Sequence, residues 1–193
     1  MERGLLIILS GPSGVGKGTI RKYFETDESL NLAYSTSMTT RKPRAGEVDG
    51  KDYFFINEDT INTYYNDNKL AEFTKYNNNY YGVSYDELSK SDILVIEPNG
   101  LKKIKESNKL SNVNIFSIFL SLSEDEQIKR MKNRGDKDAD IYKRISHDKK
   151  LFIPDTELYD VIIPTKDYKD FNNMIAYQIN SYINYNKNMD VFK

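Results

Sequence analysis

The feature that most constrains this chain is a glycine-rich loop near its start, Gly-Pro-Ser-Gly-Val-Gly-Lys-Gly-Thr over residues 11–19. An apolar run at residues 5–9 predicts a strand before the loop, and the apolar spacing over residues 20–24 predicts a helix after it. A strand that enters such a loop and a helix that leaves it direct backbone N–H groups toward a bound anion. Lys17 adds a positive charge that can reach the outer phosphates of a nucleotide. A glycine-rich turn without a ligand is the alternative, but the lysine and the flanking pattern favour a phosphate-binding loop.

Position 18 departs from the usual phosphate-binding loop. Gly18 stands where Ser or Thr usually follows the lysine, and Thr19 comes one residue later. We therefore expect the loop to bind phosphate, without predicting that a hydroxyl ligates Mg²⁺ directly.

The composition limits what else the chain can do. Its 193 residues allow one sizeable core with inserted subdomains, and a net charge of −1 gives no overall field that would attract nucleic acid or an anionic membrane. The absence of cysteine excludes disulfides and thiolate metal sites, and we expect the single histidine, His147, on an exposed helix surface. No apolar run could span a bilayer, and residues 1–4 show no signal-peptide pattern, so we expect a soluble, cytoplasmic protein.

A polar loop over residues 37–50 is the next candidate for ligand binding. It follows a predicted strand at residues 31–35, and Pro43 and two glycines exclude a helix there. Arg41 and Arg44 lie close together within this loop. Their forked guanidinium donors favour phosphate binding, although a solvated loop with scattered charge is the alternative interpretation.

The segment from residue 34 to residue 88 is predicted to be an inserted subdomain. Aromatic and alternating patterns predict three strands and one short helix: strands 52–56, 70–74 and 80–84 and a helix over 58–66. Strands joined by short turns favour an antiparallel sheet. Glu72 would share one strand face with Leu70 and Thr74, but most carboxylates on such strands face water, so this residue alone assigns no ligand.

A buried-strand pattern over residues 92–96 ends at an acidic residue, Glu97. Ligands gather at the carboxyl ends of strands in an open parallel sheet, so Glu97 would lie near the phosphate-binding loop if this strand neighbours the first. A turn at residues 98–100 leads into a helix that ends near residue 107, and residues 114–120 have a further strand pattern.

Arginines in the second half of the chain suggest a lid. A helix that begins at Ser123, with a glutamate three residues later, would place Arg130 and Arg134 on one face. A polar stretch at residues 135–140 separates it from a second helix, beginning near residue 141, that carries Arg144. Ordinary surface charge could explain each arginine alone, but three around one polar hinge favour a lid that closes on phosphates. Two more patterns predict the last elements: a strand at 159–163 and an amphipathic helix over 171–185.

Together these segments resemble the guanylate kinase family, whose members phosphorylate GMP with ATP. The resemblance is carried by residues 11–19, a Thr-Thr-Arg-Lys-Pro-Arg-Ala-Gly-Glu run over 39–47, Asp-Gly-Lys-Asp-Tyr over 49–53, Tyr-Tyr-Gly over 80–82, and Arg130 with Arg134 and Gly135. These segments keep the family's order and cover nearly the whole chain.

The resemblance implies an α/β protein with the three-layer P-loop kinase fold. Such a protein has a central, mainly parallel sheet, an inserted mixed or antiparallel GMP-binding subdomain and a helical lid. In this single domain of residues 1–193 the implied parts are a core of residues 1–33, 89–125 and 148–193, a GMP-binding subdomain of residues 34–88 and a lid of residues 126–147.

The resemblance also implies roles for the matching positions. ATP would bind to Gly11, Pro12, Ser13, Gly14, Val15, Gly16, Lys17, Gly18, Thr19, Arg130 and Arg134. GMP would bind to Ser37, Arg41, Arg44, Tyr53, Glu72, Tyr81 and Glu97, and Glu72 would read guanine. The implied catalytic residues are Lys17, Arg44, Arg134 and Arg144.

The implied activity is reversible phosphorylation of GMP, and of dGMP, by in-line transfer from ATP. Mg²⁺ would arrive with ATP, and a contact through water with Thr19 or Glu97 is left open. Besides Gly18, three positions differ from the family's usual residues: Val83, Val95 and Pro164. The alternatives are a non-catalytic interaction module of the same fold and a kinase for another nucleoside monophosphate. The protein would be a monomer or a homodimer without nucleic-acid or membrane partners.

Overall fold

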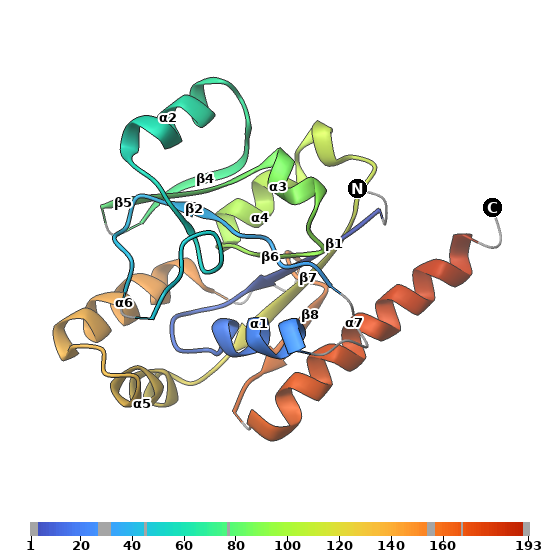
Figure 1. Cartoon of the computed structure of the whole chain (residues 1–193). Helices are drawn as coiled ribbons and strands as arrows, with labels where there is room; N and C mark the ends of the chain where they lie inside the picture. Colours follow the sequence, from blue (N-terminus) through green and yellow to red (C-terminus); the bar gives the residue numbers. More distant parts are fainter. Residues whose placement is uncertain are drawn as a thin grey trace. The chain divides into compact units, whose positions relative to one another are not determined.

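The computed structural model describes residues 4–26, 32–44, 46–76, 78–153, 157–166 and 168–190. The chain forms two compact units. The first comprises residues 1–6 and 33–115, and the second comprises residues 7–32 and 116–193. Figure 1 shows both units and labels most of their helices and strands.

One sheet has four parallel strands in the order β6-β1-β7-β8. These strands are β1 (Leu5–Ser10), β6 (Ile93–Val95), β7 (Asn114–Ser121) and β8 (Val161–Pro164). Their sequences are nearly continuous apolar runs, and the side chains from Leu6 to Leu9 are fully buried, as is typical of parallel strands covered on both faces. The predicted strands at these positions are confirmed, with small shifts at their ends.

The second unit contains the helices α1 (Lys17–Thr26), α5 (Glu124–Asn133), α6 (Asp138–Leu151) and α7 (Tyr168–Asp190). Helices α5 and α6 lie side by side (Figure 1), and Met131, Ile141 and Ile145 form the buried contact between them. His147 is exposed on α6, as predicted. Within the described part of the chain, no helix combines the length and apolar character needed to span a membrane.

Several predictions for this unit need correction. Helix α6 begins at Asp138, inside the stretch predicted as a hinge, because Asp138 and Asp140 in its first turn stabilise a helix N-terminus. Helix α7 extends beyond both ends of the predicted helix over 171–185. Ser123 occupies the N-cap of α5, but its side chain makes no capping hydrogen bond. Its carbonyl instead accepts from the Gln127 N–H at 3.0 Å.

The first unit contains a mixed sheet in the order β3-β2-β5-β4. Its strands are β2 (Met38–Thr39), β3 (Phe54–Phe55), β4 (Leu70–Tyr76) and β5 (Asn79–Ser84). Strand β5 pairs antiparallel with β2 and β4, whereas β2 pairs parallel with β3. The predicted antiparallel pair is therefore confirmed, and β2 is a short strand inside the segment predicted as a loop over 37–50.

The helices of this unit are α2 (Glu58–Asn66), α3 (Tyr85–Ser89) and α4 (Pro98–Lys105), followed by the 3₁₀ turn η1 (Asn108–Leu110). Helix α2 has the predicted bounds. Asn57 caps it, since its Oδ1 accepts from the Thr60 N–H at 2.8 Å. Two lysines donate to main-chain carbonyls on or just before the outer strand β4: Lys103 Nζ to Phe73 O at 3.2 Å, and Lys109 Nζ to Asn68 O, before the strand, at 3.1 Å.

The predicted strand over residues 31–35 is wrong for the residues that the structure describes there. Tyr34 forms only an isolated parallel bridge with Ile93, and Asn31 lies outside the described residues. Hydrogen bonds do hold this segment beside β6, since Ser35 N donates to Ile93 O and Ile93 N donates to Ala33 O. A single bridge does not make a continuous ladder, so apolar character alone overestimated the strand.

Candidate active site

The glycine-rich loop begins where β1 ends at Ser10 and finishes where α1 begins at Lys17. Gly11 and Gly14 have positive φ angles of 152° and 76°. A Cβ at Gly11 would lie 2.5 Å from the Leu120 carbonyl oxygen, and a Cβ at Gly14 would lie 2.9 Å from that of Gln127. Both glycines are therefore required, because β7 and α5 approach the loop more closely than a side chain allows.

Lys17 folds back over the loop that precedes it. Its Nζ donates to the carbonyl oxygen of Gly11 and, at 2.9 Å, to that of Pro12, and it lies 5.7 Å from the centre of the Phe152 ring. The first turn of α1 is closed by N–H groups of Thr19 and Ile20, which donate to Gly16 O at 2.9 and 3.1 Å. The ammonium group thus lies beside the loop that leads into the N-terminus of α1. A helix N-terminus of this kind is a common phosphate-binding site.

Gly18 has a different environment from the other loop glycines. It is exposed, and no described atom lies within 4 Å of a Cβ built there. Steric contact therefore does not require glycine at position 18, and a hydroxyl-bearing residue would fit. Thr19, the neighbouring hydroxyl, is also exposed.

A carboxylate from α6 binds the same loop. Asp148 is only 4% exposed, and its Oδ2 accepts from the Ser13 N–H at 2.6 Å. The sequence analysis missed this residue. The one available signal was its spacing, since Asp148 follows Arg144 by four positions and so shares a helix face with it.

Arg130 on α5 contacts the loop through its guanidinium group. Its guanidinium donates to Val15 O at 3.2 Å and to the carbonyl oxygen of Thr165, just after β8. It also lies 3.4 Å from Lys166 O and 3.5 Å from Gly14 O. Arg130 therefore ties the loop to the end of the sheet, and the prediction that it also binds ATP stays a prediction.

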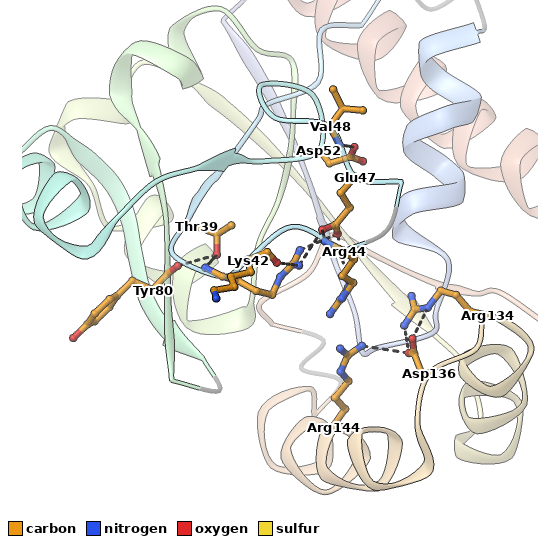
Figure 2. Close-up of polar contacts among 11 residues, drawn as sticks. Thr39, Lys42, Arg44, Glu47, Val48, Asp52, Tyr80, Arg134, Asp136 and Arg144 are labelled. Carbon is orange, nitrogen blue, oxygen red and sulfur yellow. Dashed lines mark hydrogen bonds and ion pairs between the residues drawn. The ribbon is translucent and has the colours of Figure 1, made fainter.

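Arg134 and Arg144 share one carboxylate, that of Asp136 (Figure 2). Arg134 Nε donates to Asp136 Oδ1 at 3.2 Å and its Nη2 pairs with Oδ2, while Arg144 Nη1 lies 3.4 Å from the same Oδ2. The shared carboxylate offsets the repulsion between the two cations. Asp136 was also missed, because the sequence does not say which of many nearby acidic residues an arginine will contact.

In the first unit, Arg41 and Arg44 both contact Glu47; Figure 2 labels Arg44 and Glu47. Arg41 makes a forked pair, with Nη1 2.9 Å from Oε2 and Nη2 2.8 Å from Oε1. The Arg44 N–H donates to Oε2 at 2.6 Å. Burial favours a raised pKa for Glu47, but the hydrogen bonds and charges of the two arginines outweigh it and lower that pKa.

Aromatic rings surround the Arg41 guanidinium. It lies 5.3 Å from the centre of the Tyr53 ring and 5.7 Å from that of Phe55. Tyr53 meets Tyr81 edge to face at 6.0 Å, and burial raises the pKa of the Tyr53 phenol. The carbonyl of Ser37 accepts from the Phe54 N–H at 2.9 Å, which fixes the strand beside these rings. The structure thus gathers the arginines and tyrosines predicted to bind one phosphate.

Glu72 is buried, with 6% exposure, so the expectation that a carboxylate on this strand faces water is wrong. It pairs with Val83 in the sheet, and a Cβ at Gly100 would lie only 2.7 Å from its Cγ. Burial, followed by the charge of Glu97 and offset by that of Lys103, raises the pKa of Glu72 to about 8. No described residue gives this carboxyl group a hydrogen bond. A buried carboxyl group without a donor from the protein can accept hydrogen bonds from a ligand.

The predicted site residues therefore fall into two sets, each within one unit. The first unit holds Ser37, Arg41, Arg44, Tyr53, Tyr81, Glu72 and Glu97, and the second holds residues 11–19, Arg130, Arg134 and Arg144. Among the described residues, no three acidic or histidine side chains form a metal-binding group. Since Mg²⁺ is usually held by substrate phosphates and water with few side chains, the loop residues fit an ion that arrives with a polyphosphate.

Comparison with known proteins gives concordant results. The family described as guanylate kinase matches residues 3–182. A guanylate kinase of Lactobacillus johnsonii is 41% identical over 183 residues, covering 91% of this chain and 84% of that protein. A guanylate kinase of Bacillus cereus is 40% identical over 168 residues, which cover 84% of this chain and 80% of that protein. The crystal structure of guanylate kinase from Anaplasma phagocytophilum superposes with a TM-score of 0.66 at 26% identity, covering 93% of this chain and 86% of that one.

Proposed function

This chain belongs to the guanylate kinase family, and from that premise we propose that it transfers the γ-phosphoryl group of ATP to GMP, giving ADP and GDP. The observation that carries the choice of GMP is the buried carboxyl group of Glu72, which lacks a hydrogen-bond donor among the described residues. The proposal includes dGMP, because the base and the phosphate supply the recognition.

Guanine fits such a carboxylate because N1–H and the N2 amino group are adjacent donors on its Watson–Crick edge. Both can be accepted by one carboxylate, which favours the ionised form of Glu72. Adenine presents a bare N1 acceptor at the same place and would leave the carboxylate unpaired and repelled. A buried polar group that loses its partner costs about 1–3 kcal/mol, more if it is charged.

The phosphate of GMP would be held by Arg41 and Arg44, with the phenols of Tyr53 and Tyr81. In this role Glu47 orients Arg41 by its forked pair, in which both contacts are 2.9 Å or shorter. Arg44 keeps more of its side chain exposed, 46% against 15% for Arg41. Arg44 is therefore better suited to follow the phosphate as it reacts.

The donor phosphates would be held by the loop and by Lys17, with Arg134 and Arg144 on the group in transfer. No protein nucleophile is required, because a phosphate oxygen of GMP attacks the γ-phosphorus as its bond to ADP breaks. Catalysis then consists of bringing two polyanions together and neutralising the charge on the transferring oxygens. Mg²⁺ bound with ATP would neutralise further phosphate charge, held by those phosphates and, through water, by Thr19 or Glu97.

A coupled assay that offers GMP, dGMP, AMP, UMP and dTMP separately with ATP tests the proposal. We expect turnover with GMP and dGMP alone, and we expect Glu72→Gln to raise KM for GMP about tenfold or more while weakening the preference over AMP. Turnover of AMP or a pyrimidine nucleotide at the rate of GMP would refute the assignment. Unchanged discrimination in Glu72→Gln would show that guanine is read elsewhere.

A further inference from the structure

Helix α6 and the C-cap residue that follows it contact the phosphate-binding loop at two points. Asp148 accepts the Ser13 N–H at 2.6 Å. Phe152, four residues later, places its ring 5.7 Å from the Lys17 ammonium nitrogen. The hydrogen bond between Asp148 and Ser13 is the more specific of the two contacts, because a charged hydrogen bond has a defined direction and length.

The carboxyl group of Asp148 is buried beside the phosphate-binding loop, where a negative charge needs partners within the protein. Asp148 is 4% exposed, so its carboxyl group has little contact with water and depends on those partners. It also lies against a loop whose N–H groups suit anions, where its charge would repel the phosphates of ATP. Its Oδ2 accepts the Ser13 N–H of that loop, while its Oδ1 lies 3.8 Å from His147 Nδ1 on the helix itself, so the Ser13 contact is the one that joins α6 to the loop.

The same face of α6 carries Arg144. Residues four apart in a helix lie one turn apart on one face, about 6 Å from each other. The helix between them is anchored in the core, because Ile145 is 5% exposed and packs against Met131 of α5. A fixed distance between Asp148 and the loop therefore fixes the distance between Arg144 and the loop.

We propose that Asp148 is a positioning residue for phosphoryl transfer, which ties α6 to the phosphate-binding loop and so sets where Arg144 meets the transferring group. This inference rests on the proposed function, in which Arg144 acts on that group. A displacement of about 1 Å at a reacting centre can cost on the order of 10²-fold in rate. Loss of the tie would therefore slow transfer without changing how GMP binds.

A double-mutant cycle tests the inference. Asp148→Ala should lower kcat about tenfold and leave KM for GMP unchanged, because GMP binds to residues of the other unit. Asp148→Asn keeps an oxygen that can accept the Ser13 N–H, and it should restore kcat to within about threefold of the parent. The matched control is Ser146→Ala, an exposed change on the same helix, which should leave both constants unchanged.

The decisive comparison is between Arg144→Ala and Asp148→Ala combined with Arg144→Ala. If Asp148 acts through Arg144, the double variant should be no more than about twofold slower than Arg144→Ala alone. Losses that multiply would overturn the inference and leave Asp148 a structural residue. If Asp148→Ala does not fold, Asp148→Ser replaces it in the cycle, since its short side chain keeps the site polar but cannot reach Ser13.

The proposed function fails in a different way. An inactive parent enzyme in the GMP assay would refute the function itself. A parent that is active while Arg144→Ala has no effect would refute the role of Arg144, and the inference about Asp148 with it.

Discussion

Replacing Glu72 by glutamine should change how the stability of the unliganded protein depends on pH. The carboxyl group is 6% exposed, and its pKa is raised from 4.5 to about 8 by burial and then by the charge of Glu97. In the unfolded chain the same group ionises near 4.5. Glutamine keeps the size of the side chain and removes the titration.

The sign follows from proton binding in the two states. Between pH 4.5 and about 8 the native state keeps a proton that the unfolded chain has lost, so the free energy of unfolding falls as pH rises. This stabilising contribution is complete below 4.5 and is lost as pH rises through about 8. Inside the window the slope should approach about −1.4 kcal/mol per pH unit, and the whole shift is worth on the order of 5 kcal/mol.

Urea unfolding at about pH 5.5, 6.5 and 7.5 measures the effect. We expect the parent to lose stability relative to Glu72→Gln by roughly 1 kcal/mol or more for each step. Glu106→Gln, which removes an exposed carboxyl group from the same unit, is the matched control and should follow the parent. Parallel pH curves for the parent and Glu72→Gln would refute the reasoning, since they would mean that Glu72 ionises alike in both states.

Three further changes test other parts of the site. Lys17→Ala should lower kcat by roughly 10²–10³-fold or more while the variant still folds, because the ammonium group beside the loop carbonyls and over the Phe152 ring is lost from the phosphate site; near-normal turnover would reject its role. Glu47→Gln should raise KM for GMP about tenfold, since a half-buried Arg41 loses its charged partner, whereas a lower KM would mean that Glu47 competes with the phosphate. Gly18→Ser should fold normally, gain about 0.5 kcal/mol in stability from the helix start and reduce the Mg²⁺ concentration needed for half-maximal rate. Lost stability in that variant would show that position 18 requires glycine.

Local patterns predicted much of the fold because they depend on neighbouring residues. The loop at residues 11–19 and helix α2 stand where their spacing placed them, and the α/β architecture is confirmed. The wrong strand at 31–35 shows the limit of this approach. Its backbone has one bridging partner, and the number of partners is set by the tertiary fold rather than by the residues themselves.

The site was predicted less completely, because charged partners are chosen in three dimensions. Family motifs predicted roles for Arg41, Arg134 and Arg144, but they assigned none to the carboxylates that contact these arginines, although Glu47 ends the motif run over 39–47. Glu47 lies six residues from Arg41, whereas Asp148 lies 135 residues from Ser13. Nothing in a sequence with 29 acidic residues singles out that last pair. The roles given to these residues, and the division into core, subdomain and lid, stay predictions.

The lysines beside strand β4 bear on the behaviour of concentrated protein. An outermost strand offers its main-chain groups to any second molecule, and this is a common start of edge-to-edge aggregation. Here Lys103 and Lys109 already donate to carbonyls at Phe73 and Asn68, and each also brings a positive charge that a second copy would have to approach. These contacts occupy one acceptor within β4 and one just before it, and so make intermolecular pairing at this edge of the sheet less favourable.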